Sequence, residues 1–139
     1  EMVLRLVGSE MCIRDRPVAA NSPYFVKGSN FLKEKLGDGM HKGITATANG
    51  FYGPQGRSLR LGAKVPNLNE YLNRFEYKGN KITNFEMETS ALYGLCALLG
   101  HEAGTVCAII ANRFSKSYSK DYKKTVDQLI ELTLHRLTQ

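Results

Sequence analysis

Three short groups of residues combine side chains that could bind a small ligand. The first is Phe51, Gln55 and Arg57 in the stretch FYGPQGR. A carboxamide offers a donor beside an acceptor and a guanidinium offers only donors, so with an aromatic ring they suit a planar base such as uracil. We expect Phe51 to stack on the ring, Gln55 to pair with N3–H and O2, and Arg57 to donate to O4, which disfavours cytosine. The alternative is a Gly/Pro turn with both polar side chains solvated.

The second group is Glu86, Met87 and Glu88. A carboxylate that accepts two hydroxyl hydrogens fits the 2′,3′-diol of a ribose, and Met87 could pack on the sugar. The alternative is that these acids only stabilise the positive end of a helix. Two acids this close in sequence indicate neither a metal site nor a pair of glycosidase carboxylates.

The third group is Asn112 and Arg113, which follow the apolar run GTVCAIIA. A polar pair at this place is also typical of a cap or a turn. Three cysteines without CxxC spacing predict no disulfide framework and no metal site, and the three histidines have no partner motif.

The elements that must position these groups follow from hydrophobic periodicity and from Gly and Pro breaks. We expect a loop and then a short helix within 21–37, strands at 43–52 and 81–85, helical turns at 67–75 and a turn at 78–80. Further along we expect a helix at 87–99, a strand buried on both faces at 104–111, and a helix at 121–137. This order predicts an α/β fold with parallel strands. Ligands of such sheets bind beyond the carboxyl ends of the strands, where all three groups fall.

Composition limits the classes of protein. The chain has 139 residues and a formal net charge of +6. It lacks the run of about 18 apolar residues that a membrane span needs, so we expect no membrane partner. The positive charge alone does not indicate nucleic acid, and the SKSYSKDYKK run is expected to be a solvated helix entry. The cysteine usage favours a reducing, cytoplasmic setting.

The first residues differ from the rest of the chain. Residues 1–16, EMVLRLVGSEMCIRDR, resemble an adapter-like read-through, and we predict a non-native head there, with 17–139 forming the domain. A native amphipathic first helix is the alternative.

The stretches ITATANGFYGPQGR, NFEMETSALYGL and CAIIANR resemble the uridine phosphorylase branch of the nucleoside phosphorylase family. The likeness covers roughly 17–138. It implies a three-layer α/β domain with a mixed, largely parallel central sheet, of which this chain would be the C-terminal half. It also implies phosphorolysis of uridine by inorganic phosphate with no other cofactor, by a homo-oligomer that is a hexamer built of dimers.

The resemblance assigns roles to individual residues. Gln55 and Arg57 match the uracil-recognising pair, and Phe51 matches an aromatic that packs on base and ribose. Glu88 matches the acid that holds the ribose hydroxyls, so Arg57, Gln55 and Glu88 would be the catalytic residues. The other residues that would line the pocket are Glu86, Met87, Ile110, Ala111 and Arg113.

The resemblance also implies an incomplete enzyme. Family members are much longer, and their N-terminal half carries a Gly-rich phosphate loop and phosphate-binding arginines that this chain lacks. We therefore expect the chain alone to be inactive. The alternatives are a purine nucleoside phosphorylase, a nucleoside hydrolase of the same fold, or a non-catalytic fragment. Purine-specific relatives use an aspartate where this chain has Asn112, which favours a pyrimidine.

Overall fold

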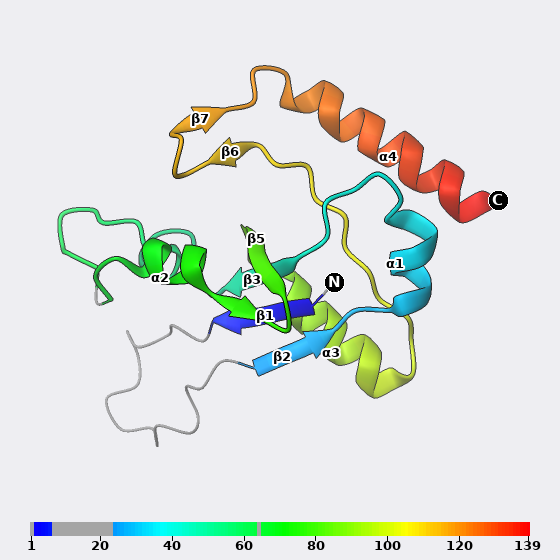
Figure 1. The fold of residues 1–139 in the computed structure, drawn as a ribbon, viewed down its shortest axis with the longest axis horizontal. Helices are drawn as coiled ribbons and strands as arrows, with labels where there is room; N and C mark the ends of the chain where they lie inside the picture. The colour runs from blue at the N-terminus through cyan, green and yellow to red at the C-terminus, as the bar shows by residue number, and fades with distance from the viewer. Residues whose placement is uncertain (1, 7–23, 64) are drawn as a thin grey trace.

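The computed structural model describes residues 2–6, 24–63 and 65–139. Its centre is a five-stranded sheet in the order β2-β1-β3-β5-β4 (Figure 1). The strands are β1 (Met2–Leu6), β2 (Tyr24–Lys27), β3 (Ile44–Ala48), β4 (Glu76–Tyr77) and β5 (Asn80–Glu86). β3 pairs in parallel with β1 and β5, whereas β2 and β4 add antiparallel edges. The predicted α/β class with a mixed sheet is therefore confirmed.

β3 forms the core of the sheet. All five of its residues are at most 2% exposed, so both faces are covered. Two threonines can be buried there because their hydroxyls are paired: Thr45 Oγ1 donates to Asn84 Oδ1 at 2.9 Å, and Thr47 Oγ1 donates to Glu86. These side-chain bonds add to the parallel backbone pairing and fix β3 against β5.

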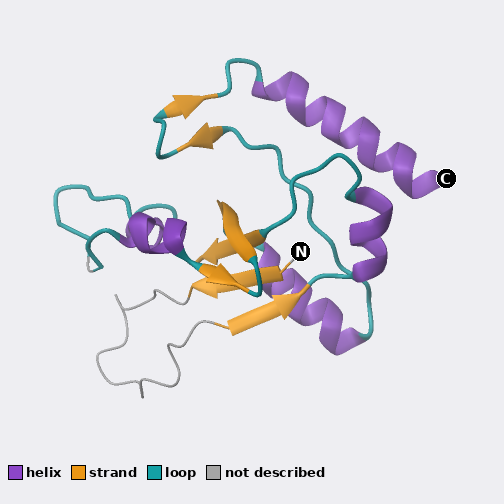
Figure 2. Ribbon diagram, viewed as in Figure 1, coloured by secondary structure: helices purple, strands orange, loops and turns teal. Residues whose placement is uncertain are grey.

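The four helices form where the sequence predicts them. They are α1 (Asn30–Leu36), α2 (Leu68–Arg74), α3 (Thr89–Leu99) and α4 (Tyr122–Thr138). Ser29 caps α1 by accepting a hydrogen bond from the amide of Leu32 at 3.0 Å. Gly100 ends α3 with φ of 73°, a left-handed conformation that favours glycine. α3 packs on β1, β2 and β3 and so covers one side of the sheet (Figure 2).

Strand β2 corrects one expectation about the N-terminal part. The sequence places a loop before α1, whereas Tyr24–Lys27 pairs antiparallel with β1. Local composition does not indicate which distant segment a strand will pair with. At the other edge, Lys78 and Gly79 have φ of 50° and 76°, which confirms the predicted turn between β4 and β5. Phe25 stacks on Tyr77, with ring centroids 4.7 Å apart.

The apolar run at 104–111 does not form the predicted buried strand. Residues 101–110 have no regular secondary structure, and Ile109 is 56% exposed. The carbonyl of Ala103 accepts a hydrogen bond from the amide of Ser29 at 2.8 Å, so the start of the segment is held by the loop before α1. Of residues 101–112, Ala111–Asn112 alone forms a strand (β6), which pairs with Ser117–Tyr118 (β7). β-branched composition favours a strand, but a strand also needs a neighbour that pairs with its backbone.

The leucine-rich side of α3 faces outward. Leu92, Leu95, Leu98 and Leu99 are exposed, whereas the helix buries Thr89, Ser90 and Tyr93. We call these four leucines the leucine face. An exposed apolar face on a folded domain favours association.

Replacing Leu95 and Leu98 by lysine is expected to reduce self-association of the chain. Both side chains are exposed, so the free energy of unfolding should change by less than about 0.5 kcal/mol each. Sedimentation velocity over a concentration series measures the effect. Leu61→Lys is the matched control, because Leu61 is also exposed but lies outside the leucine face. The same mass distribution in all three proteins would contradict the prediction.

Helix α4 rests on the domain through few interactions. None of its side chains is buried. Arg136 Nη1 donates to the backbone carbonyls of Leu36 and Asp38, the latter at 2.9 Å, at the end of α1. A single guanidinium therefore satisfies carbonyls that the short helix α1 leaves open.

The head predicted at residues 1–16 is described only in part. Residues 2–6 form β1 between β2 and β3, while residues 7–16 lie outside the described residues. The prediction that this head is non-native stays a prediction.

Candidate functional site

The loop after β3 folds back on itself and turns Gln55 inward. It contains a 3-10 helix, η2 (Gly53–Gln55), and the amides of Gln55 and Arg57 both donate to the carbonyl of Tyr52 at 3.0 Å. Gly56 has φ of 70°, and a Cβ there would lie 3.0 Å from the side chain of Asn69. Glycine is therefore required between the two candidate base-binding residues.

Gln55 is the hub of the candidate site. It is 4% exposed, so the alternative of a solvated turn residue is wrong for Gln55. Its Oε1 accepts hydrogen bonds from Arg57 Nη1 at 2.7 Å and from Arg113 Nη2. Arg113 Nη1 also donates to the backbone carbonyl of Gln55. Two residues predicted from separate motifs, 56 positions apart, thus converge on one amide oxygen.

Each arginine also lies over an aromatic ring. Arg57 Cζ is 3.7 Å from the ring centroid of Phe51, and Arg57 Nη1 donates to the Phe51 carbonyl. Arg113 Cζ is 4.6 Å from the centroid of Phe85. Such cation–π contacts favour a fixed guanidinium plane. Phe51 is half exposed, so a planar ligand could reach it, although Arg57 covers part of its face.

Arg113 experiences an unfavourable electrostatic environment. Partial burial lowers the pKa of its guanidinium, the positive charge of Arg57 lowers it further, and Tyr118 partly opposes this shift. Two cations that share one neutral acceptor favour a ligand that brings oxygen acceptors or negative charge. The arrangement suits a base whose carbonyl oxygens gain negative charge during a reaction.

Glu86 acts as a cap at the start of α3. One carboxylate oxygen accepts from the hydroxyl of Thr47, and the other accepts from the amides of Glu88 at 2.7 Å and Thr89 at 2.5 Å. Thr47 Oγ1 in turn accepts from the buried amide of Ser90 at 3.0 Å. This is the helix-end role weighed as the alternative in the sequence. A ribose contact of Glu86 stays a prediction and would compete with these bonds.

Glu88 and Met87 are exposed beside this cap. Within the described part of the chain, the Glu88 carboxylate accepts one hydrogen bond, from the amide of Met87 to Oε2 at 3.2 Å. A carboxylate in this position is free to take hydroxyl donors, and the adjacent Met87 offers an apolar surface. Glu88 is therefore better placed than Glu86 to bind a sugar.

The last predicted group lies on the hairpin of β6 and β7. Asn112 Oδ1 accepts from the amides of Phe114 and Ser115 at 3.0 and 3.1 Å, which confirms the turn alternative for Asn112. Ile110 and Ala111 are exposed just before it. Of this group, Arg113 is the residue that hydrogen-bonds to Gln55.

The structure thus forms two groups at the carboxyl ends of neighbouring parallel strands. Phe51, Gln55, Arg57 and Arg113 meet after β3, and Glu86, Met87 and Glu88 follow β5. Sequence reasoning did not identify two supporting residues, Phe85 under Arg113 and Thr47 under Glu86. Phe85 directly precedes Glu86 and Thr47 lies within the strand predicted at 43–52, but the partner of each comes from another element.

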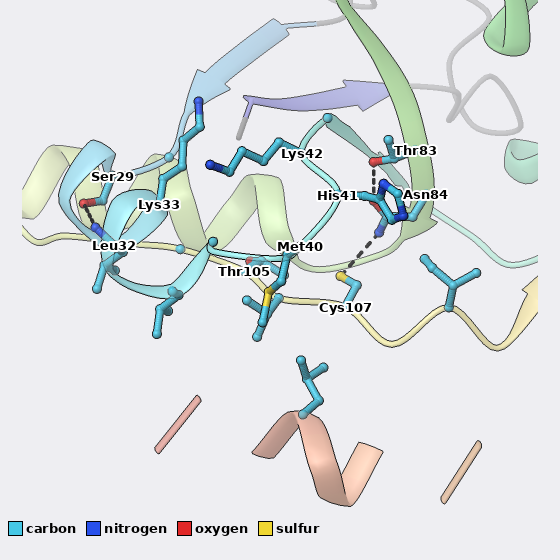
Figure 3. Close-up of a pocket in the computed structure, with 18 of the residues that line it drawn as sticks. Ser29, Leu32, Lys33, Met40, His41, Lys42, Thr83, Asn84, Thr105 and Cys107 are labelled. Atoms are coloured by element: carbon cyan, nitrogen blue, oxygen red, sulfur yellow. Dashed lines mark hydrogen bonds between the residues drawn. The ribbon is translucent and has the colours of Figure 1, made fainter. Parts of the chain in front are cut away.

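A pocket of about 470 Å³ lies at the other end of the sheet (Figure 3). It is bordered by α1 and the loop to β3, by Thr83 and Asn84 of β5, and by residues 104–107. Lys33, His41 and Lys42 supply basic groups at its rim, and no acidic residue lines it within the described chain. None of the predicted site residues belongs to it. In residues 2–6, 24–63 and 65–139, no group of three or more His, Cys, Asp or Glu could hold a metal ion, and no helix has the length and apolar character of a membrane span.

Comparisons with known proteins agree on one family. Residues 19–138 match the model of the phosphorylase superfamily. The uridine phosphorylase of Thermococcus kodakarensis is 39% identical over 97 residues, 66% of this chain and 32% of that protein. A Schistosoma mansoni protein named inactive uridine phosphorylase B is 32% identical over 133 residues, 87% of this chain and 44% of that protein.

A solved structure shows the same fold. A Trypanosoma brucei nucleoside phosphorylase, described as showing uridine phosphorylase activity, superimposes with a TM-score of 0.79 at 22% identity. The superposition covers 99% of this chain and 56% of that one. The chain therefore spans between about a third and about half the length of the proteins it matches.

Proposed function

The chain belongs to the phosphorylase superfamily, and on this premise we propose that it supplies the base and ribose sites of a uridine phosphorylase. The observation that supports this most directly is the buried Gln55 amide, held by Arg57 and Arg113 at the carboxyl end of β3. An amide beside a guanidinium matches the N–H and C=O edge of uracil. The relatives named uridine phosphorylase support the same substrate.

In the proposed reaction, an oxygen of inorganic phosphate forms a bond to C1′ of uridine while the C1′–N1 bond breaks. The N1 electron pair passes to the base, which leaves as the uracil anion and takes a proton from solvent, and ribose 1-phosphate remains. Negative charge grows on the base oxygens, where Arg57 and the Nε2 of Gln55 donate. These bonds strengthen in the transition state and therefore accelerate the step. Glu88 would hold the ribose hydroxyls and favour positive charge near C1′.

We propose that phosphate is bound by residues outside this chain. Its relatives are about twice as long, and the Gly-rich phosphate loop implied by the resemblance does not occur in the sequence. The chain alone should then bind base and sugar without turning over. The leucine face of α3 supports a further proposal, that the active form is a homo-oligomer in which apolar surface is covered.

The test is phosphate-dependent release of uracil from uridine. It is run on the chain alone and on a hybrid in which the N-terminal part of the Thermococcus kodakarensis enzyme replaces residues 1–16 and must supply a strand in place of β1. We expect activity only in the hybrid and only with phosphate. Release without phosphate would indicate a hydrolase, and activity on inosine instead of uridine would indicate a purine enzyme. A folded hybrid that neither binds nor cleaves uridine would refute the proposal.

A second candidate is a nucleoside-binding protein without catalysis. The inactive uridine phosphorylase B of Schistosoma mansoni matches over 87% of this chain, which favours this candidate. A hybrid that binds uridine with a normal dissociation constant but releases no uracil would support it.

A further inference from the structure

We propose that Thr47 is a positioning residue for sugar binding: its hydroxyl holds Glu86 as the cap of α3 and thereby leaves the carboxylate of Glu88 available to the ribose hydroxyls. The inference rests on the proposed role of Glu88 in the ribose site. It goes beyond that role by identifying the buried group that keeps the Glu88 carboxylate out of the helix end.

The first amides of α3 are capped from two positions other than the Glu88 side chain. Glu88 occupies the N-cap, where a side-chain oxygen commonly accepts from an amide of the first turn, but within the described chain its carboxylate makes no such bond. Instead, one Glu86 oxygen accepts from the amides of Glu88 and Thr89, at 2.7 and 2.5 Å. Thr47 Oγ1 accepts from the amide of Ser90 at 3.0 Å. The next amide along the helix donates to the backbone carbonyl of Glu88 at 3.2 Å, so the cap is complete.

The direction of both hydrogen bonds through the Thr47 hydroxyl is determined by its partners. An amide only donates, so Oγ1 is the acceptor for Ser90, and its single proton goes to the carboxylate of Glu86. Glu86 is then held on both oxygens, one by β3 and the other by the start of α3. Hydrogen bonds to a carboxylate are stronger than those between neutral groups. The hydroxyl therefore fixes Glu86 on the strand, and Glu86 fixes the turn that carries Glu88.

Loss of the Thr47 hydroxyl is expected to draw Glu88 into the helix end. Ser90 is fully buried, so its amide would lose its acceptor at a place where an unpaired donor is costly. From the N-cap, a side-chain oxygen can reach the amide two positions further on, and the exposed Glu88 is able to rotate toward it. A carboxylate that caps the helix can no longer place its two oxygens on the ribose diol.

Thr45 offers a matched control on the same strand. Thr45 and Thr47 are both at most 2% exposed, and both hydroxyls donate to a side chain of β5. The partner of Thr45 is Asn84 Oδ1, at 2.9 Å, whereas the partner of Thr47 is the capping residue Glu86. Thr45→Val and Thr47→Val therefore remove equivalent buried hydroxyls, and of the two it is Thr47→Val that disturbs the cap of α3.

The first experiment asks whether Glu88 replaces Thr47 at the helix end when no ligand is present. Hydrogen exchange of the Ser90 amide is measured with and without Glu88→Ala. In the unaltered chain, where Thr47 accepts this amide, Glu88→Ala should leave the exchange rate unchanged. In Thr47→Val it should raise the rate about tenfold or more, as for the loss of one hydrogen bond. Thr47→Ser and Thr45→Val should behave like the unaltered chain. The same effect of Glu88→Ala in every background would overturn the proposal.

The second experiment measures what the sugar contributes to binding. Dissociation constants for uridine and for uracil are obtained by NMR titration of the unaltered chain, Thr47→Val, Thr47→Ser and Thr45→Val. The preference for uridine over uracil should fall about tenfold in Thr47→Val, because the diol loses its acceptor. It should be retained in Thr47→Ser, which keeps the hydroxyl, and in Thr45→Val. Equal loss of affinity for both ligands would overturn the inference, since a merely structural role predicts that result.

The two experiments separate this inference from the proposed function. If the unaltered chain binds uridine no more tightly than uracil, the proposed ribose site fails and with it the sugar part of the inference, while exchange of the Ser90 amide still decides the role of Thr47 at the cap. If the unaltered chain prefers uridine and Thr47→Val keeps that preference, the ribose site stands and the inference is overturned. Thr47→Ala, which also lacks the hydroxyl, takes the place of Thr47→Val if valine prevents folding.

Discussion

Arg57→Ala is expected to lower kcat/KM for uridine phosphorolysis by about 100- to 1,000-fold in the hybrid protein, with most of the loss in kcat. A donor aimed at an oxygen that gains charge in the transition state is worth about 2.7–4 kcal/mol of barrier. Arg57 lies beside Gln55 Oε1, where O4 of a bound uracil would come within reach. Steady-state kinetics on uridine at saturating phosphate measure the effect.

The stability of Arg57→Ala should change much less than its activity. Arg113 still satisfies Gln55 Oε1 in the variant, so no buried acceptor loses all its donors. The matched control is Arg60→Ala, which removes an exposed arginine three positions further along the same loop. Equal kcat/KM in Arg57→Ala and Arg60→Ala would refute the assignment of Arg57.

Glu86→Ala and Glu88→Ala are expected to have opposite main effects. Removing the Glu86 carboxylate leaves the amides of Glu88 and Thr89 and the hydroxyl of Thr47 without their acceptor. The free energy of unfolding of this chain should fall by about 2–3 kcal/mol, as is typical for hydrogen bonds to a charged group. Glu88→Ala should change stability little but lower kcat/KM of the hybrid by about 100-fold, because the sugar is no longer held.

Urea denaturation of the chain and kinetics of the hybrid separate the two roles. Glu86→Gln is the conservative variant, since its amide oxygen can keep part of the cap at the start of α3. It should recover part of the lost stability. A larger loss of stability in Glu88→Ala than in Glu86→Ala would show that the two carboxylates have been assigned the wrong way round.

Elements with strong local patterns could be predicted from the sequence. The helix before Gly37, the helix before Gly100 and the C-terminal helix α4 form as expected, because caps and periodicity are properties of neighbouring residues. The strand predicted at 104–111 does not form, and the strand β2 was not predicted. Both depend on which distant backbone lies alongside, and composition does not record that.

The candidate site shows the same division. Residue types predicted that Gln55 and Arg57 act together, and their mutual hydrogen bond confirms that they are adjacent. The convergence of Arg113 on Gln55 was expected only from the rule that the ends of parallel strands meet. The strand assumed at 104–111 does not form, and Arg113 reaches Gln55 from the β6–β7 hairpin instead. The supporting residues Phe85 and Thr47 could not be found, because each acquires its role from a partner about 28 to 39 positions away.

The attachment of α4 has a consequence for how the molecule opens. The apolar side chains of α4 are at most half-buried, so the helix gains less from the hydrophobic effect than a core element does. The carbonyls at the end of α1 can take water in place of Arg136. The free energy that separates the docked from the detached helix is therefore a small part of the free energy of unfolding. Separating β3 from the sheet, in contrast, requires unfolding of the whole core. Gln55 and Arg57 belong to the loop after β3, and Arg113 belongs to the β6–β7 hairpin, so none of the three lies on α4. Base recognition should therefore persist in molecules whose last helix has already undocked.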